Sequence, residues 1–153
     1  KNPNSAVSSG NVTVLCSGVY DPNNTNANTE SSFYSIYPSD LTISFSKDLP
    51  SIYNAKNLLE NYSGNNYYFS AESGVYRTNT SITNINSIIS IDTDVLAINS
   101  EQYIVNDSTN AYSDILYMND LNNIGKVYKY NTTLSSFVDT LTFNGNVLDI
   151  VFK

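Results

Sequence analysis

The sequence predicts an all-β protein, an antiparallel β-sandwich-like domain of about ten to twelve short strands. Two features of the chain predict this class. Runs rich in Val, Ile, Leu, Tyr and Phe recur every eight to fourteen residues, and clusters of Asn, Ser, Gly and Asp separate them. Several runs also alternate apolar and polar residues, which places one face of a strand in a core and the other in solvent.

The predicted strands cover most of the chain. In order, they are residues 12–17, 33–37, 41–46, 66–71, 74–78, 87–91, 95–98, 102–106, 114–118, 126–130, 137–143 and 146–152. Alternation is strict at 41–45, where Leu41, Ile43 and Phe45 share one face. These three side chains are therefore expected in the core.

A chain of 153 residues has the size of one ordinary domain. Residues 1–10 are polar and are expected to form a flexible N-terminal segment, with a single all-β domain over residues 11–153. The first strand, 12–17, is expected to pair either with the last strand, 146–152, or with a strand of a neighbouring subunit.

Two local patterns predict how particular segments fold. Asn144-Gly145 separates two apolar runs, and both residues tolerate the positive φ angles of a tight turn, so we expect a hairpin there. One short helix is predicted near residues 50–62. Pro50 suits its first turn, and Ile52, Ala55, Leu59 and Tyr62 follow at spacings of three and four.

A possible internal repeat gives alternatives for the architecture. Residues 75–98 align without gaps to residues 127–150 and share seven of 24 positions, and residues 18–25 resemble the start of both segments. Three units of about 50 residues would suit a three-repeat β-trefoil or a propeller-blade arrangement. The other interpretation is that any antiparallel domain of this composition produces similar hairpins.

Composition disfavours several classes of partner and of chemistry. The net charge is −7 and Arg77 is the single arginine, so the chain lacks the basic face that binding to nucleic acid requires. No apolar run approaches the length of a membrane-spanning helix, and we expect no membrane insertion. The chain has no His, which removes imidazole-based catalysis and metal binding. We expect a protein that is not an enzyme.

A candidate metal site lies at Asp92 and Asp94, two residues apart in the run IDTDV. At a strand end both carboxylates would project to the same side, and calcium accepts such oxygen ligands in flexible geometry. One interpretation is therefore a calcium site, and the other is an ordinary solvated loop. No other cofactor is expected. Cys16, the single cysteine, lies in an apolar alternating run and is expected to be a small core residue.

Six N-x-S/T sequences are candidate glycosylation sites: Asn11, Asn23, Asn61, Asn79, Asn106 and Asn131. Asn, Ser and Thr fill 59 positions, so composition alone explains their number. Few charges with abundant Asn, Ser, Thr and Tyr are typical of extracellular or cell-surface proteins. The first ten residues contain neither a leader sequence nor a Met, which favours a signal peptide that has already been removed.

These observations predict a secreted, non-enzymatic structural or adhesive surface subunit. Its expected partners are copies of itself or other surface proteins, with which it builds a filament, sheath or coat by strand pairing. Two alternatives remain open. A carbohydrate-binding, lectin-like module would use the 13 Tyr side chains to contact glycans. A fragment of a larger extracellular β-propeller would explain the repeat.

Overall fold

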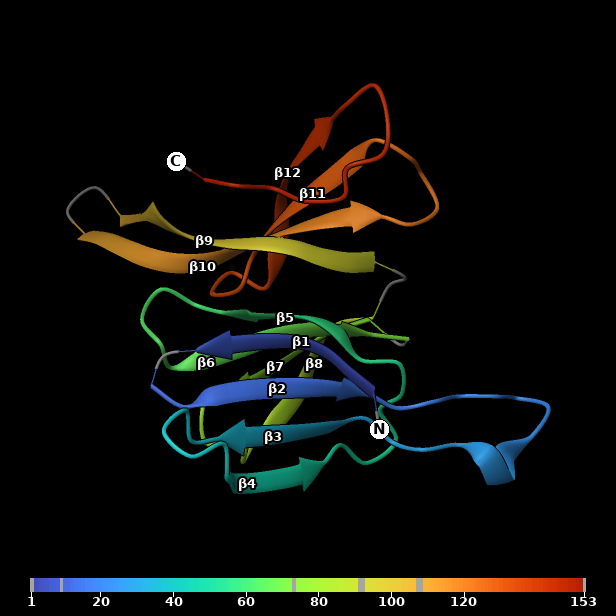
Figure 1. Cartoon of the computed structure of the whole chain (residues 1–153). Helices are drawn as coiled ribbons and strands as arrows, with labels where there is room; N and C mark the ends of the chain where they lie inside the picture. Colours follow the sequence, from blue (N-terminus) through green and yellow to red (C-terminus); the bar gives the residue numbers. More distant parts are fainter. Residues whose placement is uncertain (1, 9, 73, 91–92, 107–108, 153) are drawn as a thin grey trace.

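The computed structural model confirms the all-β antiparallel class. It describes residues 2–8, 10–72, 74–90, 93–106 and 109–152, except for the side chains of residues 100–111. These residues form twelve strands in three antiparallel four-stranded sheets and one short 3₁₀ turn, Thr25–Ala27 (Figure 1). The described strands close no barrel.

Each sheet is a meander of four strands that are consecutive in the sequence. The first sheet contains β1 (Asn2–Ser8), β2 (Val12–Ser17), β3 (Ser32–Ile36) and β4 (Ile43–Asp48). The second contains β5 (Lys56–Glu60), β6 (Asn66–Ala71), β7 (Gly74–Asn79) and β8 (Ile85–Ile89). The third contains β9 (Thr93–Asn106), β10 (Thr109–Asp120), β11 (Lys126–Asn131) and β12 (Ser136–Thr142).

The second sheet lies between the other two and is apolar on both faces. Because side chains alternate along a strand, Tyr67 and Phe69 of β6 point to one face and Tyr68 to the other. On the first face Phe69 meets Phe33 of β3, with ring centroids 5.4 Å apart. On the second face Tyr68 packs in a cluster with Leu116 of β10. This explains why the run YYF does not alternate.

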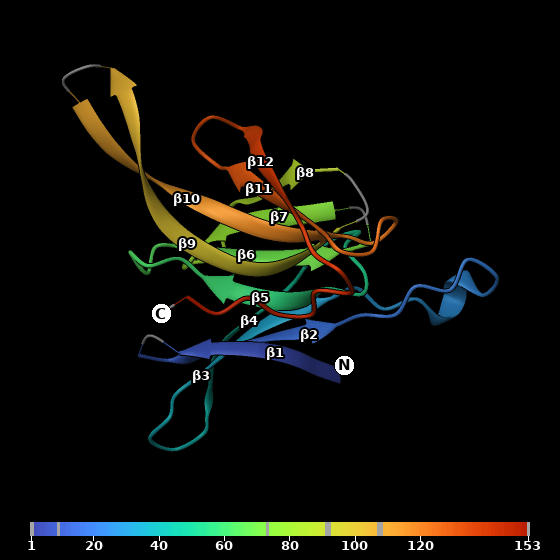
Figure 2. The ribbon, with the colours of Figure 1, turned by 90° about the horizontal axis from the view of Figure 1, so that it is seen from above.

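The first strands of the three sheets lie next to one another. β1 contacts β5, and β5 in turn contacts β9, while β4 and β12 lie at opposite ends of the molecule (Figure 1). Seen from above, the β9–β10 hairpin extends beyond the strands that it covers (Figure 2). Consecutive four-stranded meanders with adjacent first strands fit the propeller-blade alternative, whereas a trefoil would require a closed barrel.

The two best-matched segments of the repeat occupy equivalent places. Residues 75–80 and 127–132 belong largely to β7 and β11, each the third strand of its sheet. Val75 and Val127 are both fully buried. At the strand ends, Asn79 and Asn131 each accept hydrogen bonds from backbone N–H groups of the turn that follows.

The helix predicted near residues 50–62 is wrong. The segment forms turns and then β5, and Ser51, Asn54 and Asn57 have φ angles of 58°, 52° and 57°. Such left-handed residues cannot belong to a right-handed helix. The expected core residue Tyr62 is 94% exposed. β5 pairs with β6, and the N–H of Leu58 donates to Oγ of Ser5 in β1. Leu58, which the helical pattern placed off the core face, is buried in the core.

The two chain ends also differ from the prediction. Residues 1–10, expected to be flexible, contain β1, which pairs with β2 from Asn2 to Ser8. The first predicted strand, now β2, therefore pairs with β1 and β3 and not with residues 146–152. At Asn144-Gly145 the chain turns, but no ladder follows. Val147 and Ile150 instead pack across the outer face of the third sheet, because burial against that face replaces pairing along β12.

The core face predicted for residues 41–45 is wrong as well. Leu41, Ile43 and Phe45 are 77%, 61% and 40% exposed. β4 is the edge strand of the first sheet, and no other described element covers this part of it. Alternation reports which residues share a face but not whether a second layer covers that face.

Candidate functional site

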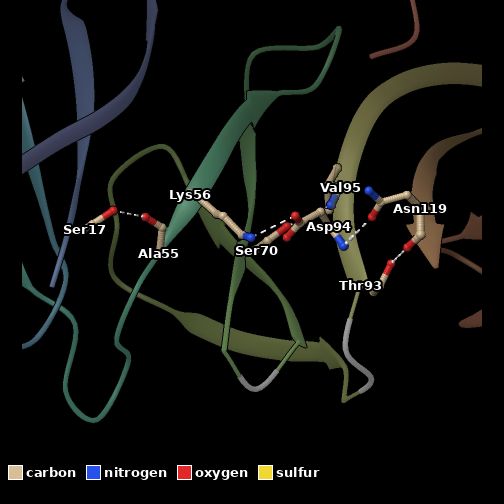
Figure 3. A network of polar contacts seen from close by, with 8 residues as sticks. All are labelled: Ser17, Ala55, Lys56, Ser70, Thr93, Asp94, Val95 and Asn119. Carbon is tan, nitrogen blue, oxygen red and sulfur yellow. Dashed lines mark hydrogen bonds and ion pairs between the residues drawn. The ribbon is translucent and has the colours of Figure 1, made fainter. Parts of the chain in front are cut away.

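The carboxylate pair considered for calcium is described only in part, since Asp92 lies outside the described residues. Asp94 of β9 forms an ion pair with Lys56 of β5, with 2.8 Å between Oδ2 and Nζ (Figure 3). A cation that approached Asp94 would have to displace this ammonium group. The described residues include no group of three or more Cys, Asp or Glu side chains that could hold a metal ion.

Asp94 belongs to a series of polar contacts that joins the three sheets (Figure 3). Ser17 at the end of β2 donates its hydroxyl hydrogen to the carbonyl oxygen of Ala55, 2.7 Å away, just before β5. The N–H of Val95 in β9 donates to Oγ of Ser70 in β6 at 2.8 Å. The first bond fixes the first sheet against the second, and the other fixes the second sheet against the third.

Asn119 of β10 fixes the start of β9 within the third sheet (Figure 3). Its side-chain oxygen accepts a hydrogen bond from the N–H of Asp94 at 3.0 Å, and its backbone carbonyl oxygen accepts one from the hydroxyl of Thr93. Asp94 is therefore held by its backbone as well as by Lys56. This geometry supports a structural role for Asp94 at the junction between sheets.

A second polar site lies where the second and third sheets meet, on the side of the β5–β6 turn. We call it the tyrosine-rimmed cleft. It has a volume of about 300 Å³, and its principal lining residues are Asn61, Tyr62, Tyr68, Arg77, Tyr112 and Asp114. They come from the β5–β6 turn and from β6, β7 and β10. Segments far apart in the sequence therefore build one site.

The floor of the tyrosine-rimmed cleft is a bonded pair of side chains. Tyr68, which is only 1% exposed, donates its hydroxyl hydrogen to Oδ2 of Asp114 at 2.8 Å. Burial is the main cause that raises the pKa of Tyr68 above its ordinary value of 10.0, and the hydrogen bond and charge of Asp114 add to it. The hydroxyl of Tyr68 therefore stays protonated at physiological pH and is available as a donor.

The buried amide of Asn61 forms one wall and fixes the turn above it. Its Oδ1 accepts the N–H groups of Asn65 and Asn66, both at 3.0 Å. Its Nδ2 lies 2.9 Å from Oγ of Ser63 and 3.0 Å from Oδ2 of Asp114. The turn and the carboxylate are thus held by the same side chain, and the wall is rigid before any ligand arrives.

The rim carries two exposed aromatic rings and one cation. Tyr62 is 94% exposed and Tyr112 is 71% exposed. Both rings also line an adjoining hollow of about 540 Å³ with Ser63 and Asn99. Arg77 is half-buried in the cleft, and no described group forms a hydrogen bond or an ion pair with its guanidinium. The cleft thus offers guanidinium donors that the described part of its walls does not use.

The candidate glycosylation sites lie in different environments. Asn61 and Asn131 are 5% and 2% exposed and hold turns through their side chains. Asn11 and Asn23 are exposed, and Asn79 is half-buried in a turn where it bonds Thr83. The side chain of Asn106 lies outside the described ones. Of the five acceptor Asn side chains that the structure describes, those of Asn61, Asn79 and Asn131 thus hold turns.

Cys16 lies inside the first sheet, as its alternating run predicted. It is 5% exposed and forms no disulfide. Its neighbour on β2, Leu15, is fully buried toward the opposite face. The position suits a small core-filling thiol, which burial protects from reagents in solution.

Sequence reasoning did not find the tyrosine-rimmed cleft. Asp114 is an isolated carboxylate in a strand, and Asn61 was considered only as a glycan acceptor. The run NYSGNN carried the available signal, because Asn followed by Ser, Gly and Asn suits a turn closed by the first side chain. Nothing in the sequence indicates that this turn meets β10.

No family model and no curated protein matches the chain. Among the described residues there is no helix with the length and apolar character needed to cross a membrane.

Proposed function

We propose that the protein is a non-enzymatic structural or adhesive subunit of an extracellular surface, which self-assembles through its open edge strands. The observation that carries the proposal is the exposure of Leu41, Ile43 and Phe45. Their alternation is typical of a strand with one covered face, yet the fold of a single chain leaves this face open. A second copy of the chain would supply the missing cover.

One side of this contact between copies is the β4 surface. It consists of the outer edge of β4 with Tyr37, Leu41, Ile43 and Phe45. β4 pairs only with β3, so its other edge presents backbone groups without a strand partner among the described residues. Leu41 has a φ of 58°, an unfavourable angle for a Leu, and is also 77% exposed. Strain of this kind is usually retained where a loop makes a functional contact.

The other side of the contact, on the next copy, is the β12 surface. It consists of the outer edge of β12 with Phe137 and Val138. These side chains are 48% and 47% exposed, and β11 is the one described strand that pairs with β12. The two edges match in length, with six residues in β4 and seven in β12. They lie at opposite ends of the molecule (Figure 1). A contact between different surfaces at opposite ends is head-to-tail, and it builds an open filament when the rotation from one copy to the next does not close a ring.

The test is to charge the β4 surface and measure assembly. The double variant Ile43→Lys/Phe45→Lys adds two ammonium groups to the edge, and charged side chains, Lys above all, are a natural protection against strand addition. We expect the unaltered protein to form concentration-dependent assemblies by analytical ultracentrifugation and filaments by electron microscopy. The variant should sediment as a single chain.

The matched control is Ile124→Lys, since Ile124 is 75% exposed but lies in the β10–β11 turn outside both surfaces. It should assemble like the unaltered protein. An unaltered protein that stays monomeric up to its solubility limit would count against the proposal. So would assembly that survives the double variant in a protein with an unchanged melting temperature.

A second candidate function has its own support: the chain is a section of a larger blade-built extracellular domain. Three consecutive four-stranded meanders have adjacent first strands, as blades of a propeller do. In addition, residues 147–150 (VLDI) align with residues 95–98 (VLAI) of β9, the first strand of the third sheet. These residues already pack against the outer face of that sheet through Val147 and Ile150.

The sequence of the precursor decides between the two candidates. A larger blade-built domain requires further units of about 50 residues with the same strand order next to this chain. Flanking segments with a different pattern would remove this candidate, while the assembly experiment would be unaffected.

A further inference from the structure

The tyrosine-rimmed cleft has the features of a ligand site that assembly through β4 and β12 does not use. We propose that it binds a neutral oligosaccharide. The inference is independent of the proposed self-assembly, because the cleft lies between the second and third sheets and includes no residue of either edge surface.

The polar lining matches the chemistry of sugar hydroxyls. A hydroxyl group donates one hydrogen bond and accepts others, so a sugar requires donors and acceptors side by side. Asp114 supplies acceptor oxygens, Arg77 and Asn66 supply N–H donors, and the Ser and Thr hydroxyls of the lining do both. A few convergent polar groups in a concave site are the usual arrangement of a ligand pocket.

The two exposed rings supply the apolar part of the contact. The C–H faces of a pyranose ring carry slight positive charge and pack on the electron-rich face of an aromatic ring. Tyr62 and Tyr112 border both the cleft and the adjoining hollow of about 540 Å³. Together the two hollows give room for more than one sugar unit.

The charge of the site favours an uncharged ligand. Among the residues whose side chains the structure describes, Arg77 and Asp114 are the charged ones that line the cleft, one of each sign. The whole chain carries a net charge of −7, which opposes the approach of an anionic polymer. An acidic glycan would gain one contact with Arg77 but would meet the carboxylate of Asp114.

The walls of the cleft are held in place before binding. Asn61 bonds both the turn and Asp114, and Tyr68 bonds Asp114 from below. A ligand therefore does not have to order these groups, and less binding free energy is lost. The groups that a ligand would still have to order are the exposed side chains of Tyr62 and Tyr112, which have only two rotatable bonds each.

The experiment presents the purified protein with a panel of neutral oligosaccharides built from glucose, mannose, galactose and N-acetylglucosamine. A parallel panel contains uronic acids and sialic acid. Titration by NMR or calorimetry measures each Kd. We expect binding to a subset of the neutral panel, a loss of about ten-fold for Tyr112→Ala or Tyr62→Ala, and retained binding for the Phe variants. Asp114→Asn should also weaken binding, because the carboxylate accepts more strongly than an amide.

Tyr20→Ala is the matched control. Tyr20 is 44% exposed and lies against the ring of Tyr53, away from the cleft. This variant should bind like the unaltered protein. The proposal is overturned if no neutral sugar binds, if only acidic sugars bind, or if the double variant Tyr62→Ala/Tyr112→Ala binds normally. Assembly by the two edge surfaces would be unchanged in all three cases.

Discussion

Tyr68 of β6 donates its hydroxyl hydrogen to Asp114 of β10 across the boundary between two sheets, with 2.8 Å between the oxygen atoms. The same carboxylate oxygen lies 3.0 Å from Nδ2 of Asn61. One buried tyrosine, one turn and one carboxylate thus hold the second and third sheets together. The bond that builds the floor of the cleft is also a bond that stabilises the fold.

Replacing Tyr68 by Phe tests the stability that this bond contributes. The ring and its packing remain, but Asp114 loses a buried donor. A hydrogen bond to a charged group contributes about 1.5–3 kcal/mol, so the free energy of unfolding should fall by an amount in that range. Urea denaturation measures it. An unchanged midpoint would show that solvent replaces the hydroxyl without loss.

Stability should also decrease in alkaline solution because of Tyr68. Its pKa is raised in the folded protein above the value of 10.0 that it has when unfolded. The folded state therefore keeps a proton that the unfolded chain loses, and the resulting stability is complete below about pH 10 and declines as the pH rises above it. Unfolding free energies measured at pH 9 and pH 11 should show a smaller decline for Tyr68→Phe than for the unaltered protein.

Asn61→Ala tests the role of the turn amide. The change leaves the N–H groups of Asn65 and Asn66 without their acceptor and removes a donor from Asp114. We expect a loss of about 2–3 kcal/mol in unfolding free energy. Asn23→Ala is the control, because Asn23 is exposed in a loop and should change stability by less than about 0.5 kcal/mol. Equal effects of the two changes would contradict this role.

Glycan occupancy should follow exposure when the protein is made in a glycosylating secretory cell. We expect glycans at Asn11 and Asn23, which are exposed, and none at Asn61 or Asn131, which are buried and bonded. A bulky glycan at a buried amide would break the turn that the amide holds. Mass spectrometry of glycopeptides measures each site. A fully occupied Asn61 in folded protein would contradict the structure of this turn.

Two glycines form a matched pair for backbone strain. Gly74 has a φ of +127°, and a Cβ there would lie 1.9 Å from the carbonyl oxygen of Ile89. Gly10 has a φ of +117°, and a Cβ there would meet nothing within 4 Å. Both Ala variants should lose about 1–2 kcal/mol from the angle, and Gly74→Ala should lose at least about 2 kcal/mol more from the clash. Thermal unfolding compares them, and similar losses would refute the clash.

The alternation of apolar and polar residues was sufficient to predict the all-β class and most strands, because alternation is a local property of an extended backbone. The same local reasoning failed at residues 50–62. Spacings of three and four suggested a helix, but partners in β6 offered the backbone a ladder and Leu58 a core position. Pairing between distant segments outweighed a weak helical pattern.

The candidate sites show the same limit of local patterns. The sequence identified the candidate glycosylation sequences and one pair of acidic residues, which are short patterns. It did not indicate that Asn61 and Asp114 would meet, because 53 residues separate them and only the packing of two sheets brings them together. The sequence does not indicate the ion pair of Asp94 with Lys56 either, for the same reason.

The sequence by itself determined that this chain folds into antiparallel strands joined by Asn-rich turns, since side-chain period and turn chemistry act over a few residues. The tertiary structure decided which faces are covered. It buried the run YYF of β6 on both sides, left Leu41, Ile43 and Phe45 in solvent, and joined a turn, a tyrosine and a carboxylate into one cleft. Burial depends on the order in which whole sheets pack, and that order is set by the sum of many distant contacts.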